Sequence, residues 1–535
     1  MKKTVSRIIS VIGLGLFGIV LSSCNLLGSL LSQIDDPSAE QATNAVTRTS
    51  EGDGWYTENT VLPAPLAKIG ESEYTAYLPA SGTVKILVLP IEFSDSPFTS
   101  SILSDLKIAL DGTPDQTGYW ESVSSFYEKS SYGKVKLEYE IADVYKTGRT
   151  QQEVYEANVK EKGDSYISDN GAFSVRDAYN AYRNKKNADY IKNNFDTDKN
   201  GWIDGVVAVY SGNNYQKGKL SYDKDNYYWA YAYWTVGAET GGALTWTAPN
   251  VDDPTPNLYF WLSYDFIYEA VSSPKADAHT LIHETGHMFG LDDYYPDAGG
   301  KFNAAGCWSM MDQNILDHDI FSKMLLGWSN PVIANGNGEV SINPSASSGD
   351  CILFPSSNWN GTAYDEYILL EYYTPTNLNY LDSHTRYPNR KLGYTIPGIK
   401  IYHVDARLVS RNKYGVGFNY KYVEDPKAIP LSSLSSTSTT GYKIAATNCK
   451  KDGARADTSF SLLHLMEATG INTFKVGGEG GNDTLFKKGQ SFSMKEFGTR
   501  FFPKGTTLNK GDTFDYTITV KDIQEGKATI SFKKS

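Results

Sequence analysis

The chain has 535 residues, a formal net charge of −12 and an aromatic content of 13%, which includes 38 tyrosines. Domains typically hold about 100–200 residues, so a chain of this length is expected to form two or three of them. The acidic balance argues against a nucleic-acid partner, and no segment beyond the N-terminus is long and apolar enough to span a bilayer.

The N-terminal segment has the features of a processing signal. Basic residues precede an apolar run over residues 8–21, which is too short for a comfortable membrane span. The run ends in Leu21-Ser22-Ser23-Cys24, which resembles a bacterial lipobox. We therefore expect residues 1–23 to be a lipoprotein signal peptide, and lipid on Cys24 to anchor the protein to a membrane outside the cytoplasm. An ordinary secretory signal with an incidental cysteine is the alternative interpretation.

Residues 24–80 are expected to form a tether and a short propeptide. The segment is rich in Ser, Ala, Thr and acidic residues, and it carries few large apolar groups. Three further cysteines, at positions 307, 351 and 449, are odd in number and fit no metal-binding spacing. Stability is therefore not expected to rest on a disulfide framework, although a single bridge among them stays open.

Residues 81–331 have the pattern of a mixed series of strands and helices. Apolar or alternating runs predict strands over 85–93, 135–145, 205–210 and 227–234, and helices over 120–131 and 174–195. The aromatic run 227–234 has two open interpretations. It is either an edge strand, to which an extended peptide can add as a further strand, or an interior strand.

The loop that follows the long predicted helix has the spacing Asp-x-Asp-x-Asn-Gly-x-x-Asp. Oxygen ligands at alternate positions, with glycine at the sixth, are how an EF-hand-type loop holds calcium. The twelfth position is Val207 and a strand follows, so the loop is not an EF-hand. An Asx-rich turn without an ion is the alternative. The expected ligands are the side chains of Asp196, Asp198, Asn200 and Asp204 with the carbonyl of Trp202.

Residues 283–293 have the spacing His-Glu-x-x-His-x-x-Gly-x-x-Asp. On a helix, residues four apart share one face, so His283 and His287 can hold one metal ion. Glu284 lies beside that face, within reach of a water on the metal. Gly290 can end the helix and turn the chain so that Asp293 supplies a third ligand. Three protein ligands and one open position describe a catalytic zinc site. The alternative is a helix whose histidines only cap or pack.

The third ligand separates two classes of zinc peptidase. No glutamate occurs between Glu284 and Glu339, which disfavours the class that takes a glutamate from a later helix and favours the metzincins. Metzincins need a methionine turn beneath the metal, and residues 306–312 offer Met311, with Met310 as the alternative. Ordinary core packing of both methionines is the plainer interpretation. His279 can also compete as a ligand, but a supporting role is expected.

Residues 332–535 differ from the preceding part of the chain in their sequence pattern. Short strand-like runs, separated by Gly, Asn and Ser turns, predict a β-sandwich-like region of one or two domains, with strands over 367–373, 399–404, 459–466, 513–520 and 527–532. His403 and Asp405 are expected to be a partnered structural pair, since no third metal ligand is near in sequence.

Several segments together resemble the immune inhibitor A-like metalloproteases. Residues 85–95, 122–133, 196–212, 283–293 and 321–328 carry the resemblance, which covers the chain from about Lys85 to Pro331. It implies zinc on His283, His287 and Asp293, and catalysis by Glu284. Some metzincins place a tyrosine two residues after the turn methionine to help the oxyanion, but Gln313 stands there in this chain.

The resulting expectation is an α+β fold. A metzincin-like zinc peptidase domain over residues 81–331, a mixed twisted sheet with helices, precedes the β-sandwich-like C-terminal region. The protein is expected to be a lipid-anchored endopeptidase that cleaves extracellular proteins or peptides, with zinc and also calcium as cofactors. A surface adhesin or binding lipoprotein with a vestigial peptidase domain is the main alternative, and a zinc hydrolase that acts on surface glycans is a weaker one.

Overall fold

The computed structural model describes residues 47–48, 56–57, 77–113, 116–117, 121–162, 171–213, 228–234, 249–268, 276–296, 300–412, 418–426, 440–449 and 460–535. The predicted signal peptide, Cys24 and nearly all of the predicted tether lie outside these residues. Within the described ranges, no helix combines the length and the apolar character that crossing a membrane requires.

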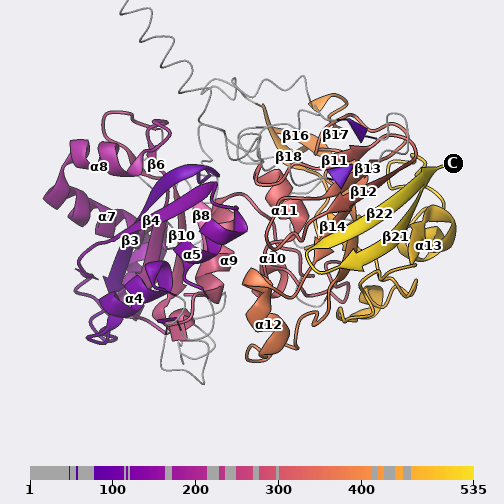
Figure 1. Cartoon of the computed structure of the whole chain (residues 1–535). Coiled ribbons are helices and arrows are strands. Elements are labelled where there is room, and N and C mark those ends of the chain that lie inside the picture. Colours follow the sequence, from indigo (N-terminus) through magenta and orange to yellow (C-terminus); the bar gives the residue numbers. More distant parts are fainter. Residues whose placement is uncertain are drawn as a thin grey trace, which may run out of the picture.

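The N-terminal half is built on one sheet, with the strand order β4-β3-β7-β10-β8 (Figure 1). The first four strands run parallel and β8 is antiparallel to β10. A short strand, β5, also pairs with β3. The bounds are β3 Gly82–Glu92, β4 Val135–Ile141, β5 Tyr145–Lys146, β7 Val206–Tyr210, β8 Tyr231–Trp234 and β10 Leu258–Ser263.

Helices cover both faces of this sheet, which explains why its central strands are almost wholly apolar. One face carries the helices α4 Ile102–Asp111, α5 Val123–Ser130 and α9 His279–Met288, together with the 3-10 helix η2 Tyr264–Tyr268. The other face carries α7 Ala172–Lys186 and α8 Ala188–Phe195. Along β3, Ile86 and Val88 belong to the first hydrophobic cluster, whereas Leu87 and Leu89 belong to the cluster on the other face. A further helix, α6, spans Gln151–Lys162.

The predicted elements of this half are largely confirmed, with one correction. The sequence predicts a single helix over 174–195, but the chain forms α7 and α8, which meet at Asn187. Asn187 has a positive φ of 77°, and its side chain accepts a hydrogen bond from Tyr190 N at 2.9 Å. It therefore ends one helix and caps the next. The described part of the aromatic run yields β8, which is the last strand of the described sheet; addition of a peptide to this strand stays a prediction.

The C-terminal half contains two larger sheets. The inner sheet has the order β19-β15-β14-β13-β11-β2, and the outer sheet has the order β1-β12-β22-β21-β20. The inner strands are β11 Val332–Ala334, β13 Ile352–Pro355, β14 Glu366–Tyr373, β15 Gly398–Asp405 and β19 Leu463–Leu465. The outer strands are β12 Gly338–Ile342, β20 Ser491–Ser493, β21 Tyr516–Gln524 and β22 Lys527–Lys534.

Two short strands lie inside the segment that the sequence predicts to be a tether. β1 Thr47–Arg48 pairs with β12 at the edge of the outer sheet, and β2 Tyr56–Thr57 pairs with β11 at the edge of the inner sheet. Part of the predicted tether therefore belongs to the folded C-terminal half.

Smaller elements complete the described fold. They are the strand pair β6 Trp202–Ile203 and β9 Thr255–Pro256, the three-stranded sheet of β16 Leu408–Asn412, β17 Phe418–Tyr422 and β18 Thr440–Ile444, the helices α10 Met310–Gln313, α11 Ile320–Leu325, α12 Tyr380–His384 and α13 Met494–Phe501, and the 3-10 helices η3 Asn377–Asn379 and η5 Phe474–Val476.

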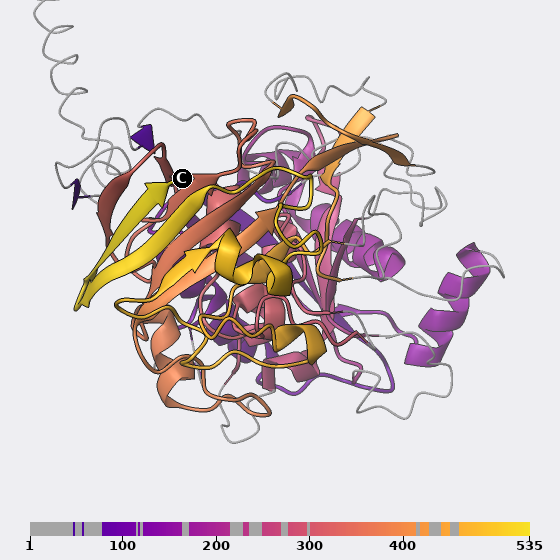
Figure 2. The same ribbon diagram turned by 90° about the vertical axis from the view of Figure 1, so that its right-hand side faces the viewer.

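The inner sheet is buried on both faces and joins the two halves. On β14, Ile368 and Leu370 pack into the cluster between the two C-terminal sheets, while Tyr367 and Leu369 pack into the cluster that also holds α9 and the first sheet. Figure 2 shows the outer sheet in front, with the N-terminal half behind it. The C-terminal strands thus form the predicted sandwich-like pair, but the predicted boundary near residue 331 is not a break in packing.

Candidate metal centre

Helix α9 lies at the junction of the two halves (Figure 1). Leu281, Ile282 and Met288 are buried and hold the helix in the core. The Tyr127 hydroxyl of α5 donates a hydrogen bond to the Ile282 carbonyl at 2.7 Å. Gly290 has a φ of 94°, the left-handed conformation that the sequence predicts for the end of this helix. The chain then turns back along the helix face.

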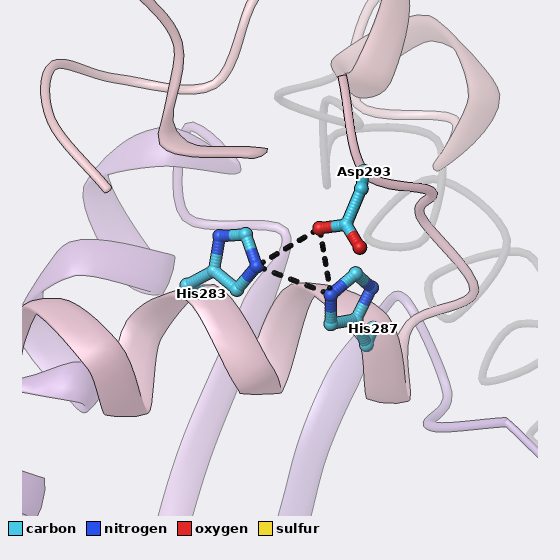
Figure 3. Close-up of side chains that lie close together, drawn as sticks. All are labelled: His283, His287 and Asp293. Atoms are coloured by element: carbon cyan, nitrogen blue, oxygen red, sulfur yellow. Dashed lines mark hydrogen bonds and ion pairs between the residues drawn. The ribbon is translucent and has the colours of Figure 1, made fainter. Parts of the chain in front are cut away.

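This turn brings three side chains together (Figure 3). The Nε2 atoms of His283 and His287 are 3.1 Å apart. The Asp293 Oδ1 atom lies 3.1 Å from His283 Nε2 and 3.2 Å from His287 Nε2. Neighbouring ligands around a tetrahedral ion with bonds of 2.0–2.1 Å lie about 3.3–3.4 Å apart, so the spacing fits a zinc ion closely.

The hydrogen bonds behind the histidines decide which ring nitrogen faces this point. His283 Nδ1 lies 2.9 Å from the Met310 carbonyl oxygen, and His287 Nδ1 lies 2.9 Å from the Leu291 carbonyl oxygen. A carbonyl only accepts, so each Nδ1 carries a proton, and in the neutral form of each ring Nε2 presents a lone pair to this point. Two lone pairs and a carboxylate that converge in this way form a donor set for a cation.

The pKa shifts of His287 and Asp293 also indicate a site that favours a cation. Burial alone would lower the pKa of His287, but the Asp293 carboxylate beside it raises that pKa to about 10. Burial alone would raise the pKa of Asp293, but the charges and hydrogen bonds of the two histidines hold it well below its usual range. The centre therefore favours positive charge, which a divalent cation supplies.

Glu284 is buried beside these ligands. The backbone N–H of Ala232, on the edge strand β8, donates a hydrogen bond to its carboxylate. The second oxygen, Oε2, is buried and has no partner among the residues that the structure describes. Burial raises the pKa of this carboxyl group, and the nearby charges of His287 and His283 act against that rise. One oxygen is thus held while the other is left for a ligand or a proton.

The loop of residues 306–312, called here the methionine loop, packs against helix α9. Met311 rather than Met310 occupies this place, because a β-carbon added to Gly286 would lie 2.4 Å from the Met311 sulfur. The Met311 carbonyl also accepts a hydrogen bond from Tyr294 N at 2.8 Å. Packing and a hydrogen bond therefore hold helix α9, the Asp293 turn and the methionine loop together.

One residue at this centre was missed by the sequence reasoning. The Tyr295 hydroxyl is hydrogen-bonded to the Asp293 side chain, and its ring lies nearly parallel to that of His283, with 6.3 Å between ring centroids. Only its position two residues after Asp293 could have signalled it. Gln313, where some metzincins have a tyrosine, instead lines a separate cavity and donates to Asp312 Oδ1 at 3.3 Å.

Hydrogen bonds from the C-terminal half hold the loops of this centre in place. The Asn448 side chain donates to the Tyr294 carbonyl at 3.1 Å and also pairs with the backbone of Leu463 on β19. Leu465 N donates to the Ala304 carbonyl at 2.7 Å, just before the methionine loop. Residues predicted to form a separate domain therefore position the metal centre.

The other histidines with open interpretations have protein partners. His279 Nδ1 lies 2.6 Å from Asp277 Oδ1, so His279 supports α9 and is not among the converging ligands. His403 lies 2.7 Å from Glu366, while Asp405 pairs with Arg407. His403 and Asp405 are thus structural, as expected, but each has a different partner.

The predicted calcium loop contains two features at once. Carboxylate oxygens of Asp196, Asp198 and Asp204 lie within 4.8 Å of one another, as a cation site requires. Asp204 also accepts from Thr197 N at 3.1 Å, and Asn200 Oδ1 accepts from Trp202 N at 2.8 Å, as an Asx-rich turn requires. Burial raises the pKa of Asp204 to about 7. Cys307 and Cys351, both among the described residues, are not joined by a disulfide.

Comparison with protein-family models and with curated proteins finds no match to this chain.

Proposed function

We propose that the chain is a zinc-dependent endopeptidase of the metzincin type. The observation that carries the proposal is the convergence of His283, His287 and Asp293 on one point, with both histidine lone pairs directed there and Glu284 buried alongside. Three ligands leave the fourth position of a tetrahedral ion open, which is typical of catalytic zinc.

Each group has a defined task in peptide hydrolysis. Zinc held by His283, His287 and Asp293 would supply Lewis acidity for the scissile carbonyl and for the acidity of the attacking water. Glu284 takes the proton of the attacking water and delivers it to the leaving amine. Its free Oε2 atom suits this exchange, because the carboxylate can gain and lose a proton while Ala232 holds the other oxygen.

The edge strand favours a peptide as the substrate. β8 ends the first sheet, contacts Glu284 through Ala232 and has β10 as its only neighbour in the described sheet. An extended peptide can add to such an edge by main-chain hydrogen bonds, which would place its carbonyl groups beside the metal centre. The lipobox pattern that ends at Cys24 supports a lipid-anchored enzyme outside the cytoplasm that acts on extracellular proteins or peptides.

Zinc content and casein hydrolysis, measured on the same preparations, test the proposal. The wild-type protein should bind one zinc ion and cleave casein, and o-phenanthroline should abolish the cleavage. Glu284→Gln should keep the zinc and lose turnover, whereas His287→Ala should lose both. His384→Ala is the matched control, because His384 is exposed on α12 and should change neither.

Two outcomes would contradict the proposal. Casein cleavage by Glu284→Gln at the wild-type rate would remove Glu284 from its role. A wild-type protein with almost no zinc, purified without a chelator, would favour the alternative of an adhesin with a vestigial peptidase half. Hydrolysis of glycans without casein cleavage would favour a different hydrolase.

The loop of Asp196, Asp198 and Asp204 is proposed to bind calcium, with Asn200 and the Trp202 carbonyl as further ligands. The convergent carboxylates support this, since calcium takes oxygen ligands in flexible geometry. The loop precedes β7 and is distant in sequence from α9, so we assign it to stability and not to catalysis.

A further inference from the structure

A cavity of about 480 Å³ lies beside α10 and carries an unusual concentration of positive charge. Its lining includes Gln313, Arg386, Arg390 and Lys391, with Glu479 as the one carboxylate. The whole chain has a net charge of −12, so this cluster runs against the overall charge. A cavity of this size falls within the range of about 300–1,000 Å³ that ligand sites occupy.

Helix α10 connects this cavity to the metal centre. At its first residue, the Met310 carbonyl accepts the proton of His283 Nδ1, and at its last residue Gln313 lines the cavity. The Arg390 Nε atom donates to the Gln313 carbonyl at 3.2 Å. Four helical residues span about 6 Å, so Gln313 lies only one short helix away from the residue whose carbonyl holds His283.

Buried Asp312 links the two sites electrostatically. Burial raises the pKa of its carboxyl group to about 7, and the charges of Asp293 and Arg390 both act on that group. The metal ligand and the arginine therefore lie within electrostatic range of the same carboxyl group.

The cations in the cavity are available to a ligand. Lys391 pairs with Glu479 at 2.8 Å, but that pair is solvent-exposed and gives weak mutual stabilisation. Arg390 bonds to a neutral carbonyl, and neither arginine forms an ion pair within the described part of the chain. Arginine presents a planar fork of donors that matches a carboxylate in a bidentate manner.

We propose that this cavity is a specificity subsite for a carboxylate of the peptide substrate. The inference rests on the proposed peptidase function. An extended peptide advances about 3.3–3.6 Å per residue, so a cavity at the far end of α10 is reached two or three residues from the scissile bond. The enzyme then favours peptides with an Asp or Glu side chain, or a terminal carboxylate, at that distance.

Paired fluorogenic peptides test this subsite. Each pair differs only by Glu against Gln at one of three positions on either side of the scissile bond. The wild-type kcat/KM should favour Glu by about tenfold at one position, because a charge-assisted hydrogen bond replaces a neutral one. The ratio should fall as ionic strength rises, since the cavity is open to solvent.

Four variants test whether the cavity causes the preference for Glu over Gln. Arg386→Gln and Arg390→Gln should each bring the Glu-to-Gln ratio towards one. Glu479→Gln should raise the ratio, because it removes the carboxylate that competes for the cations. Lys488→Gln is the matched control: it removes an exposed cation that pairs with Asp522 outside the cavity, and it should leave the ratio unchanged.

The outcomes separate this inference from the proposed function. Hydrolysis of every Glu and Gln partner at equal rates, or a preference that survives Arg386→Gln and Arg390→Gln together, would overturn the subsite. A preference that appears only with a free chain end, and disappears on amidation, would assign the cavity to a terminal carboxylate. If no peptide is cleaved at all, the peptidase proposal fails. The subsite is then decided by anisotropy on the Glu284→Gln protein, where equal affinity for the Glu and Gln peptides would overturn it.

Discussion

Replacing Gly286 by alanine probes the contact between α9 and the methionine loop. A β-carbon at position 286 would lie 2.4 Å from the Met311 sulfur and 3.1 Å from its terminal carbon. Ordinary contacts between such atoms are about 3.5–4.0 Å, so the side chain or the helix must move by about 1 Å or more. The same loop carries the Met310 carbonyl that holds His283.

Two opposing effects set the size of the change. Alanine stabilises a helix interior by about 0.5–1 kcal/mol relative to glycine. Overpacking a buried site costs about 1–3 kcal/mol, so Gly286→Ala should lose roughly 1 kcal/mol in the free energy of unfolding. The displaced loop disturbs the hydrogen bond behind His283, and such bonds are worth about tenfold or more in metal affinity. Zinc should therefore bind about tenfold more weakly.

A double-mutant cycle separates this clash from a general effect. Met311→Ala removes the atoms that the new β-carbon meets, so the double variant should lose less stability than the sum of the two single variants, with a coupling energy of about 1–3 kcal/mol. Met324→Ala, a buried methionine on α11, is the control and should be additive with Gly286→Ala. Denaturant unfolding and titration against a chromophoric chelator supply the two readouts. Additivity between positions 286 and 311, together with unchanged zinc affinity, would refute the reasoning.

Three further predictions concern other parts of the molecule. Tyr295→Phe removes the hydroxyl bonded to Asp293 and should weaken zinc binding by about tenfold in a chelator competition; unchanged affinity would mean that the bond does not position the ligand. Burial lowers the pKa of His464 to about 3, so the folded protein favours the neutral imidazole. The resulting stability is fully present above the unfolded pKa of about 6.5 and is lost as pH falls below it. Between pH 8 and pH 5 the loss should be about 2 kcal/mol, measured as the difference between wild type and His464→Leu; equal pH dependence in the two proteins would contradict it. Calcium at about 100 times its dissociation constant should stabilise the wild type by about 2.7 kcal/mol and Asp204→Asn by much less, seen as a shift in Tm; equal shifts would remove the loop as the site.

The convergence of His283, His287 and Asp293 could be predicted from the sequence because their spacing is local. His283 and His287 are one helical turn apart, and Gly290 and Asp293 follow within six residues, so helix geometry and one turn suffice to bring them together. The buried strands of the first sheet were predictable for a similar reason, since parallel strands covered on both faces need continuous apolar runs.

The remaining features depend on contacts that no local pattern contains. The break between α7 and α8 depends on the left-handed backbone of Asn187, which an asparagine allows but does not require. The cavity next to Gln313 is completed by Arg386 and Arg390, which lie far along the chain and come from a different segment. Tyr295 gains its interest only once Asp293 has turned towards the histidines. Such long-range placements follow from packing.

Strand β14 determines how much of the chain the candidate metal centre needs to stay folded. All eight of its residues are buried, and the six between Glu366 and Tyr373 that are aliphatic or aromatic divide between two hydrophobic clusters. An excised fragment of residues 81–331 would expose the apolar face that meets this strand and would lose the brace that Asn448 gives to the Asp293 turn. The N-terminal half is therefore expected to need the inner sheet to keep its fold, and the outer sheet covers the other face of the inner sheet in turn.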